Sequence, residues 1–119
     1  MRLLTAPSTY SQAETTCTEL GAFLVVPRTS AQNQCALDLA AGSNAWIGVT
    51  DRATEGVFLA ADGGGPLETP FWDYYSPNNS GGAQHCGELY FDYTRRYPEP
   101  GWNDVGCDVQ RNLICQWRP

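Results

Sequence analysis

The sequence predicts a single α+β domain covering residues 1–119, and three observations support this. Two segments with helix-capping signals and helical periodicity occupy the first third of the chain. Short runs rich in β-branched and aromatic residues fill much of the remainder, and a long glycine- and proline-rich segment separates two of them. Helices followed by strands, without the regular alternation of a parallel α/β sheet, indicate an α+β architecture.

The first helix is predicted to begin at the capping box Ser11–Glu14 and to end at Gly21. In such a box the serine side chain accepts a backbone N–H three residues on, and the glutamate side chain returns the bond. One stripe of this helix should face the core, and it comprises Tyr10, Ala13, Cys17 and Leu20.

A second capping box, Thr29–Gln32, opens a helix that is expected to end near Gly42. Between the two helices, Ala22–Val26 predicts a strand that Pro27 stops, because proline cannot donate to a strand ladder. Four further short strands are predicted, at Ala45–Val49, Val57–Leu59, Gly87–Tyr90 and Leu113–Trp117. No internal repeat or linker divides the chain, so we expect one domain.

Charge and composition exclude several classes of function. The net charge is −6 with only seven Lys and Arg residues, whereas binding nucleic acid or an anionic membrane by charge requires a basic surface. No apolar run is long enough to span a bilayer, so we expect no membrane insertion. No signal peptide precedes the first predicted helix, so we expect a domain excised from a longer secreted or surface protein.

Five cysteines in a small, loop-rich domain indicate disulfides and an oxidising compartment. Zinc binding is disfavoured because the sequence has no Cys-x-x-Cys pair and only one histidine. An odd number leaves one thiol over, and we expect it to be Cys35. This residue shares a helical face with Ala31 and Leu39, at i−4 and i+4, which predicts a buried free cysteine. Pairing with another chain is the alternative.

The long segment between Leu59 and Cys86 is the part of the chain that we expect to carry function. It contains three consecutive glycines, several prolines and no sustained apolar period. Structureless loops beyond roughly 12–15 residues are uncommon in compact domains and are usually functional or disordered. Four aromatic residues need something to pack against and therefore favour an ordered loop, namely Phe71, Trp72, Tyr74 and Tyr75.

A set of motifs follows one another along the chain, namely Trp46–Val49, Thr54–Phe58, Trp72, Ser76–Asn79, Trp102–Asp104, Cys107 and Cys115. In order and spacing, this set resembles the C-type lectin-like family. The resemblance implies two helices packed on small antiparallel sheets, with a long Gly/Pro-rich binding loop. It also implies the disulfides Cys17–Cys115, joining the chain ends, and Cys86–Cys107, bracing the loop. On burial tendency, we expect core positions for Trp46, Trp72 and Trp102.

In sugar-binding members of this family, a calcium ion and a sugar share the same protein ligands. Matched to this chain, the five positions that contact the sugar are Ser76, Asn78, Gln84, Asn103 and Asp104. Ser76 replaces a Glu or Gln with a side chain too short for the same reach, and Gln84 replaces a Glu without its charge. Calcium needs about 6–8 oxygen ligands. The resemblance therefore implies a weak calcium site formed by Asn78, Gln84, Asn103 and Asp104.

A second, weaker calcium site of the family falls on Asp51, Glu55 and Asn79. Asp51 and Glu55 keep their carboxylates, whereas Asn79 and His85 occupy positions that are usually acidic. Asn78–Ser80 is also an N-glycosylation sequon. Since a glycan on Asn78 would block the main site, use of the sequon and a working site exclude each other.

The resemblance implies a recognition module and not an enzyme. We predict carbohydrate binding with weak calcium dependence, and glycans or glycoproteins as partners. Asn78 follows the proline as in mannose-type members, so any preference should be mannose-type. Cysteine usage favours an extracellular or cell-surface location. Catalysis has little support, because His85 is the single histidine and no Cys or Ser is plausibly paired with it.

The alternative function is a calcium-independent module that binds a protein or the extracellular matrix. Aromatic side chains suit protein interfaces as well as sugar stacking, and the candidates are Tyr74, Tyr75, Tyr93 and Tyr97. The discriminating positions are Ser76 and Gln84, because carboxylates there would favour the sugar-binding function.

Overall fold

A computed structural model describes residues 1–51, 57–61, 63, 65–66, 85–91 and 101–117 of the chain. Two helices and eight strands lie within these residues and confirm the α+β class. Their order is β1 (Arg2–Ser8), α1 (Tyr10–Glu19), β2 (Phe23–Leu24), α2 (Ser30–Ala40), β3 (Ala45–Thr50), β4 (Leu59–Ala60), β5 (Gly65–Pro66), β6 (Cys86–Tyr90), β7 (Gly101–Val105) and β8 (Arg111–Gln116). A strand therefore precedes the first helix, which corrects the expected order of helices before strands.

Helix α1 begins two residues earlier than the sequence predicted. Its N-cap is Thr9, whose side chain accepts the Gln12 backbone N–H, while Gln12 Oε1 accepts the Thr9 backbone N–H at 3.0 Å. The capping box predicted at Ser11 is therefore wrong. The earlier start places Tyr10 at the first helical position, where it is buried. Leu20, expected in the core stripe, instead follows the helix as its C-cap and is 45% exposed.

Helix α2 begins where the sequence predicted. The Thr29 side chain accepts the Gln32 backbone N–H, and the Gln32 side chain bonds the backbone N–H of Arg28. The helix ends at Ala40, and the next two residues, Ala41 and Gly42, adopt positive φ angles of 53° and 86°. That left-handed pair ends the helix in the way glycine-containing C-caps usually do.

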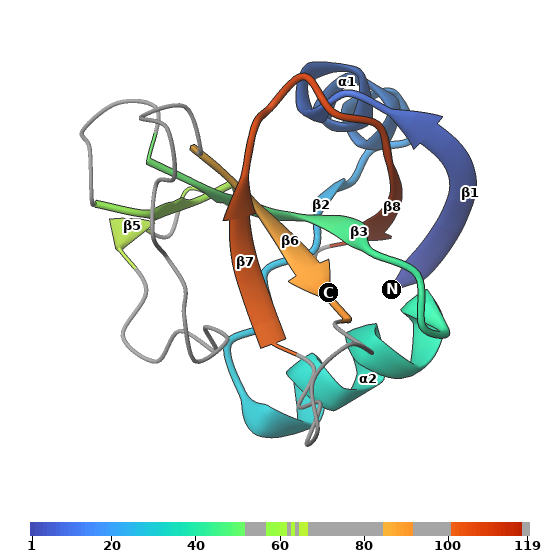
Figure 1. The fold of residues 1–119 in the computed structure, drawn as a ribbon, viewed down its shortest axis with the longest axis vertical. Coiled ribbons are helices and arrows are strands. Elements are labelled where there is room, and N and C mark those ends of the chain that lie inside the picture. The colour runs from blue at the N-terminus through green and yellow to red at the C-terminus, as the bar shows by residue number, and fades with distance from the viewer. Residues whose placement is uncertain (52–56, 62, 64, 67–84, 92–100, 118–119) are drawn as a thin grey trace.

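The eight described strands form one sheet and not several small ones (Figure 1). Its main path runs β1-β8-β3-β4-β5, and β6 pairs with both β3 and β7. All pairings are antiparallel except β3 with β8, which is parallel. The expected small antiparallel sheets are therefore one mixed sheet, in which a single pairing is parallel. Since Arg2 lies opposite Cys115, β1 and β8 also bring the two ends of the chain side by side.

Strands β1, β5 and β7 were not predicted, and the other strands differ from prediction by a few residues. Strand β7 contains Asn103 and Asp104, which are residue types common in turns and rare in strands. Strand propensity therefore did not predict it. Strand β2 spans Phe23–Leu24 instead of Ala22–Val26. Trp117 lies outside β8 and is partly exposed.

The sheet separates two apolar clusters, because alternate residues of a strand point to opposite faces. On one face, α2 packs over side chains that include Ile47, Leu89, Trp102 and Ile114. On the other face, α1 packs over side chains that include Trp46, Leu113 and Cys115. Figure 1 shows the two helices at opposite ends of the molecule, with the sheet between them. Trp46 and Trp102 are both fully buried, as predicted. Neither described helix has the length and apolar character that a membrane span requires.

The structure contains the disulfides Cys17–Cys115 and Cys86–Cys107, the two pairs that the resemblance implied. Cys35 is the free cysteine, but it is exposed, so its predicted burial is wrong. The buried stripe of α2 instead comprises Asn33, Ala36, Leu37 and Ala40. Residues two positions apart on a helix point about 200° away from each other around the helix axis. A buried stripe centred near Asn33 therefore leaves Cys35 on the opposite face.

The exposure of Cys35 predicts selective labelling. Iodoacetamide added to the native, unreduced protein should alkylate Cys35 alone, since the other four thiols are held in disulfides. Peptide mass mapping measures this directly. A Cys35 that reacts only after unfolding would contradict the structure.

The position of the α1 cap predicts a contrast between two substitutions. Thr9→Ala removes the N-cap acceptor and should lower the free energy of unfolding by about 0.5–2 kcal/mol. Ser11→Ala, at an exposed helical position, should change it by less than about 0.5 kcal/mol. Urea unfolding of both variants measures the difference. A larger loss of stability in Ser11→Ala than in Thr9→Ala would indicate that Ser11 caps the helix.

Candidate functional site

The Trp-Asn-Asp motif lies in strand β7, which pairs with β6 alone among the described strands. In this hairpin Asn103 lies opposite Glu88, and Asp104 lies opposite Gly87. Trp102 and Asp104 are fully buried, whereas Asn103 is half-buried. The disulfide Cys86–Cys107 joins the start of β6 to the segment just after β7. The motif is therefore held on a strand that is paired with β6 and braced by a disulfide.

Trp102 fixes β7 against helix α2. Its indole Nε1–H donates to Asn33 Oδ1 at 2.9 Å, and both side chains are buried. A buried indole N–H needs an acceptor, since leaving it without one is costly. This bond explains why a polar residue occupies the buried stripe of α2. It also holds β7, which carries Asn103 and Asp104, against the helix.

Glu88 is a buried carboxylate that contacts the motif directly. It is 1% exposed, although it lies in the middle of a strand between β3 and β7. Its Oε2 accepts Asn103 Nδ2 at 3.0 Å, and its Oε1 accepts Arg111 Nε at 2.8 Å. Neither Glu88 nor Arg111 was among the site residues predicted from the sequence. A carboxylate inside a predicted buried strand was the available signal, because such a group requires a partner.

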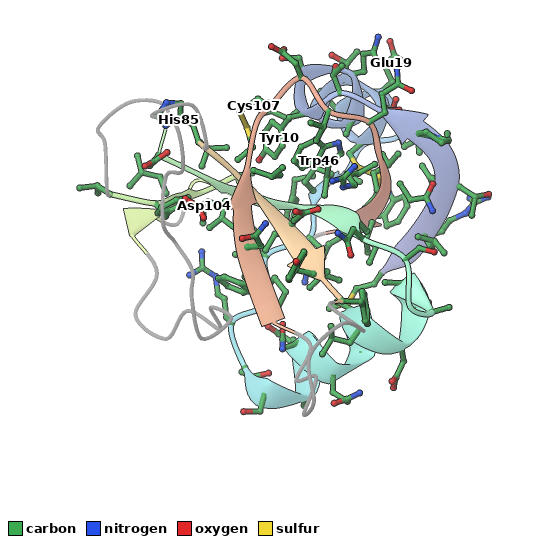
Figure 2. All side chains as sticks on the ribbon, viewed as in Figure 1. Tyr10, Glu19, Trp46, His85, Asp104 and Cys107 are labelled. Carbon is green, nitrogen blue, oxygen red and sulfur yellow. A yellow bond between two sulfur atoms is a disulfide. The ribbon has the colours of Figure 1, made fainter. Side chains whose placement is uncertain are left out.

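Asp51 and His85 extend the β3–β6 pairing by one residue. The Asp51 backbone N–H donates to the His85 carbonyl at 3.0 Å, and His85 Nδ1 lies 3.0 Å from Asp51 Oδ1. The Asp51 side chain is 2% exposed and that of His85 is 32% exposed. The His85 ring is thus half-buried against this carboxylate. Figure 2 shows His85 and Asp104 on the β5 side of the molecule, away from Tyr10 and Glu19 of α1.

Side chains at adjacent strand positions point to opposite faces of a sheet. Asn103 shares its face with Glu88, and Asp104 shares its face with Trp102. A cation that used both Asn103 and Asp104 would therefore lie at the edge of β7 that faces away from β6, where the two side chains can reach around the strand. This edge is the candidate functional site.

The donor chemistry at this edge fits calcium. A carboxylate from Asp104 and an amide oxygen from Asn103 are hard oxygen ligands of the kind calcium prefers. The second site fits less well, because Asp51 Oδ1 already has a ring nitrogen 3.0 Å away. Within the residues that the structure describes, no three His, Cys, Asp or Glu side chains gather as a metal cluster.

Most predicted ligands fall outside the described residues, namely Glu55, Ser76, Asn78, Asn79 and Gln84, as do Trp72 and the tyrosines Tyr74, Tyr75, Tyr93 and Tyr97. Their roles stay predictions. The structure places Asn103 and Asp104 side by side in β7. It places Asp51 beyond the end of β3, beside His85.

The profile of the family described as Lectin C-type domain matches residues 6–117. The chain therefore belongs to the C-type lectin domain family. Pulmonary surfactant-associated protein D of Bos taurus is 34% identical over 111 residues, which cover 92% of this chain and 28% of that protein. The chain thus spans less than a third of the length of that relative.

Solved structures share the fold. The mouse scavenger receptor C-type lectin carbohydrate-recognition domain is similar with a TM-score of 0.83 at 24% identity, over 98% of this chain and 87% of that chain. The cow C-type carbohydrate-recognition domain of CD23, in the presence of GlcNAc2Man3 oligosaccharide, gives 0.82 at 23% identity, over 96% and 84%. These likenesses support the two-helix, mixed-sheet architecture.

The Trp102–Asn33 bond predicts a loss of stability when its acceptor is removed. Asn33→Ala leaves the buried indole N–H without its partner and should lower the free energy of unfolding by about 1–3 kcal/mol. Gln34→Ala removes an amide from the exposed side of the same helix and should change it by less than about 0.5 kcal/mol. Thermal or urea unfolding measures both. Equal effects would show that the indole bond does not hold β7 to α2.

Proposed function

We propose that this domain binds glycans with the help of a weakly held calcium ion at the edge of β7. The observation that carries the proposal is the pairing of Asn103 and Asp104 on a braced strand, with the Asn103 amide nitrogen turned toward Glu88. This places the amide oxygen on the side of its carbon away from Glu88, which is where the proposed cation lies. Membership of the C-type lectin domain family and the solved relative in the presence of an oligosaccharide support the glycan as ligand.

In the proposed site, Asn78, Gln84, Asn103 and Asp104 hold calcium, and the sugar contacts the same residues together with Ser76. Asp104 is the single carboxylate of this set. Calcium affinity rises with ligand charge, and extracellular modules bind at about 10⁻⁴–10⁻³ M. We place this domain in that range. The weaker second site would use Asp51, Glu55 and Asn79.

The proposed partners are glycans or glycoproteins, with a mannose-type preference, because an amide follows the proline at Asn78. The two disulfides support an extracellular or cell-surface location, since such bonds persist in oxidising compartments. In this proposal the domain acts by binding and not by catalysis. It forms one unit, residues 1–119, of a longer secreted or surface protein.

A calcium-independent module that binds a protein is the second candidate function. The contact between Asp51 and His85 favours it, because one carboxylate of the second calcium site is already bonded within the domain. The proposed contact residues are Tyr74, Tyr75, Tyr93 and Tyr97.

Calcium titration with paired variants tests the first candidate. The wild type should bind with a Kd of about 10⁻⁴–10⁻³ M, and its melting temperature should rise with calcium. Asp104→Ala should abolish binding because it removes the single carboxylate, whereas Asp108→Ala, which removes an equal charge from an exposed turn nearby, should not. Ser76→Glu with Gln84→Glu should tighten binding by about tenfold or more, since two charged ligands are added.

A glycan array with and without chelator completes the same test. Mannose-type ligands should be retained in calcium and lost on chelation, in Asp104→Ala and in Asn78→Ala. If calorimetry detects no calcium binding by the Ser76→Glu/Gln84→Glu variant, the protein-binding function becomes the leading one. Galactose binding that survives both chelation and these substitutions would place the sugar site elsewhere.

A further inference from the structure

Glu88 has an unusual environment for a carboxylate. It is 1% exposed and lies inside the sheet, in β6 between β3 and β7. Taking an ionised carboxylate out of water is expensive unless it is paired and hydrogen-bonded. A neutral or apolar side chain at this strand position would avoid that expense. The retained carboxylate therefore calls for an explanation in terms of what it contacts.

Two donors from two other strands hold this carboxylate. Arg111 of β8 donates Nε–H to Oε1 at 2.8 Å, and Arg111 Nη1 donates to the Gln110 carbonyl at 2.9 Å. Asn103 of β7 donates its amide nitrogen to Oε2 at 3.0 Å. Arg111 is thus anchored to its own backbone and supplies the compensating positive charge, while each carboxylate oxygen has a different donor.

Donor and acceptor chemistry then fixes the orientation of the Asn103 amide. An ionised carboxylate only accepts hydrogen bonds, so the atom that faces Glu88 has to be the amide nitrogen. The amide oxygen is attached to the same carbon and must point away from β6, toward the opposite edge of β7. Turning the amide over would keep its shape but place two acceptors against each other.

We propose that Glu88, held by Arg111, is a positioning residue that sets the Asn103 amide with its oxygen toward the cation at the edge of β7. This inference rests on the proposed function. Glu88 itself touches neither the cation nor the sugar. Partners that orient a metal ligand typically contribute about 10–100-fold to metal affinity, so a weak site depends strongly on this one.

Glu88→Gln is the decisive substitution. Arg111 only donates, so the oxygen of the introduced glutamine must face Arg111, and its NH2 group then faces Asn103. The Asn103 amide is expected to turn over and present its nitrogen to the cation. Calcium affinity should fall by about 10–100-fold, whereas Glu19→Gln, the same chemical change on the exposed surface of α1, should leave it unchanged.

A second substitution that restores calcium binding distinguishes a change in amide orientation from a general loss of structure. Asn103→Asp added to Glu88→Gln provides two equivalent oxygens, one to accept from the glutamine and one for the cation, and should restore calcium binding. Asn103→Asp alone places a carboxylate against Glu88 and should weaken binding, although counting ligand charges predicts the opposite. This single variant keeps the proposal testable even where Glu88→Gln does not fold. Failure of the rescue in a folded double variant, or tighter binding by Asn103→Asp alone, would overturn the proposal.

A measurement without calcium distinguishes this proposal from the proposed function. In the wild type, one side-chain N–H of Asn103 should be protected from hydrogen exchange by Glu88, and NMR should show that protection lost in Glu88→Gln. If the wild type binds no calcium, the proposed function fails and this exchange result alone decides the amide orientation. An Asn103 side chain that exchanges equally fast in both proteins would show that Glu88 does not orient it.

Discussion

The burial of five consecutive residues in strand β3 is the constraint on which the rest of the structure depends. Residues Ala45–Val49 are all buried, and β3 pairs with β8, β4 and β6. At Gly48 the packing leaves no room for a side chain, because a Cβ would lie 2.5 Å from the Leu24 carbonyl oxygen and 2.9 Å from Ala61 Cβ. The Gly48 N–H and carbonyl instead bond Val25 and Ala61. Because Gly48 has no side chain, the segments that contain Val25 and Ala61 can both bond to β3 at this position.

The central position of β3 also explains how charge is placed inside this small domain. It holds β8 on one side and β6 on the other, so that Arg111 and Glu88 meet across the sheet at 2.8 Å. Glu88 then reaches the next strand at Asn103. A row of polar side chains therefore runs across the sheet from β8 to β7 and ends at the strand that carries two of the proposed ligands.

Local sequence signals correctly predicted the elements that are stabilised by contacts between neighbouring residues. They failed where contacts between residues far apart in the sequence determine the structure. The Thr29 cap and the strand over β3 were correct because capping and apolar runs act within a few residues. Cys35 was assigned to the wrong face because the buried stripe of α2 contains Asn33, whose hydrogen-bond donor Trp102 lies 69 residues away. Asn103 and Asp104 came from motif matching, whereas Glu88 has no motif. Its role follows only from the register that brings β6 beside β7.

The pairing of β1 with β8 has a consequence for how the domain can be displayed. Both ends of the chain lie at β8, while β7 is three strands away, or roughly 14 Å at ordinary strand spacing. A polypeptide attached at either end would leave that strand facing outward. Several copies carried on one stalk would then present their β7 strands to the same surface at high effective concentration, so a weak single site could still give strong avidity.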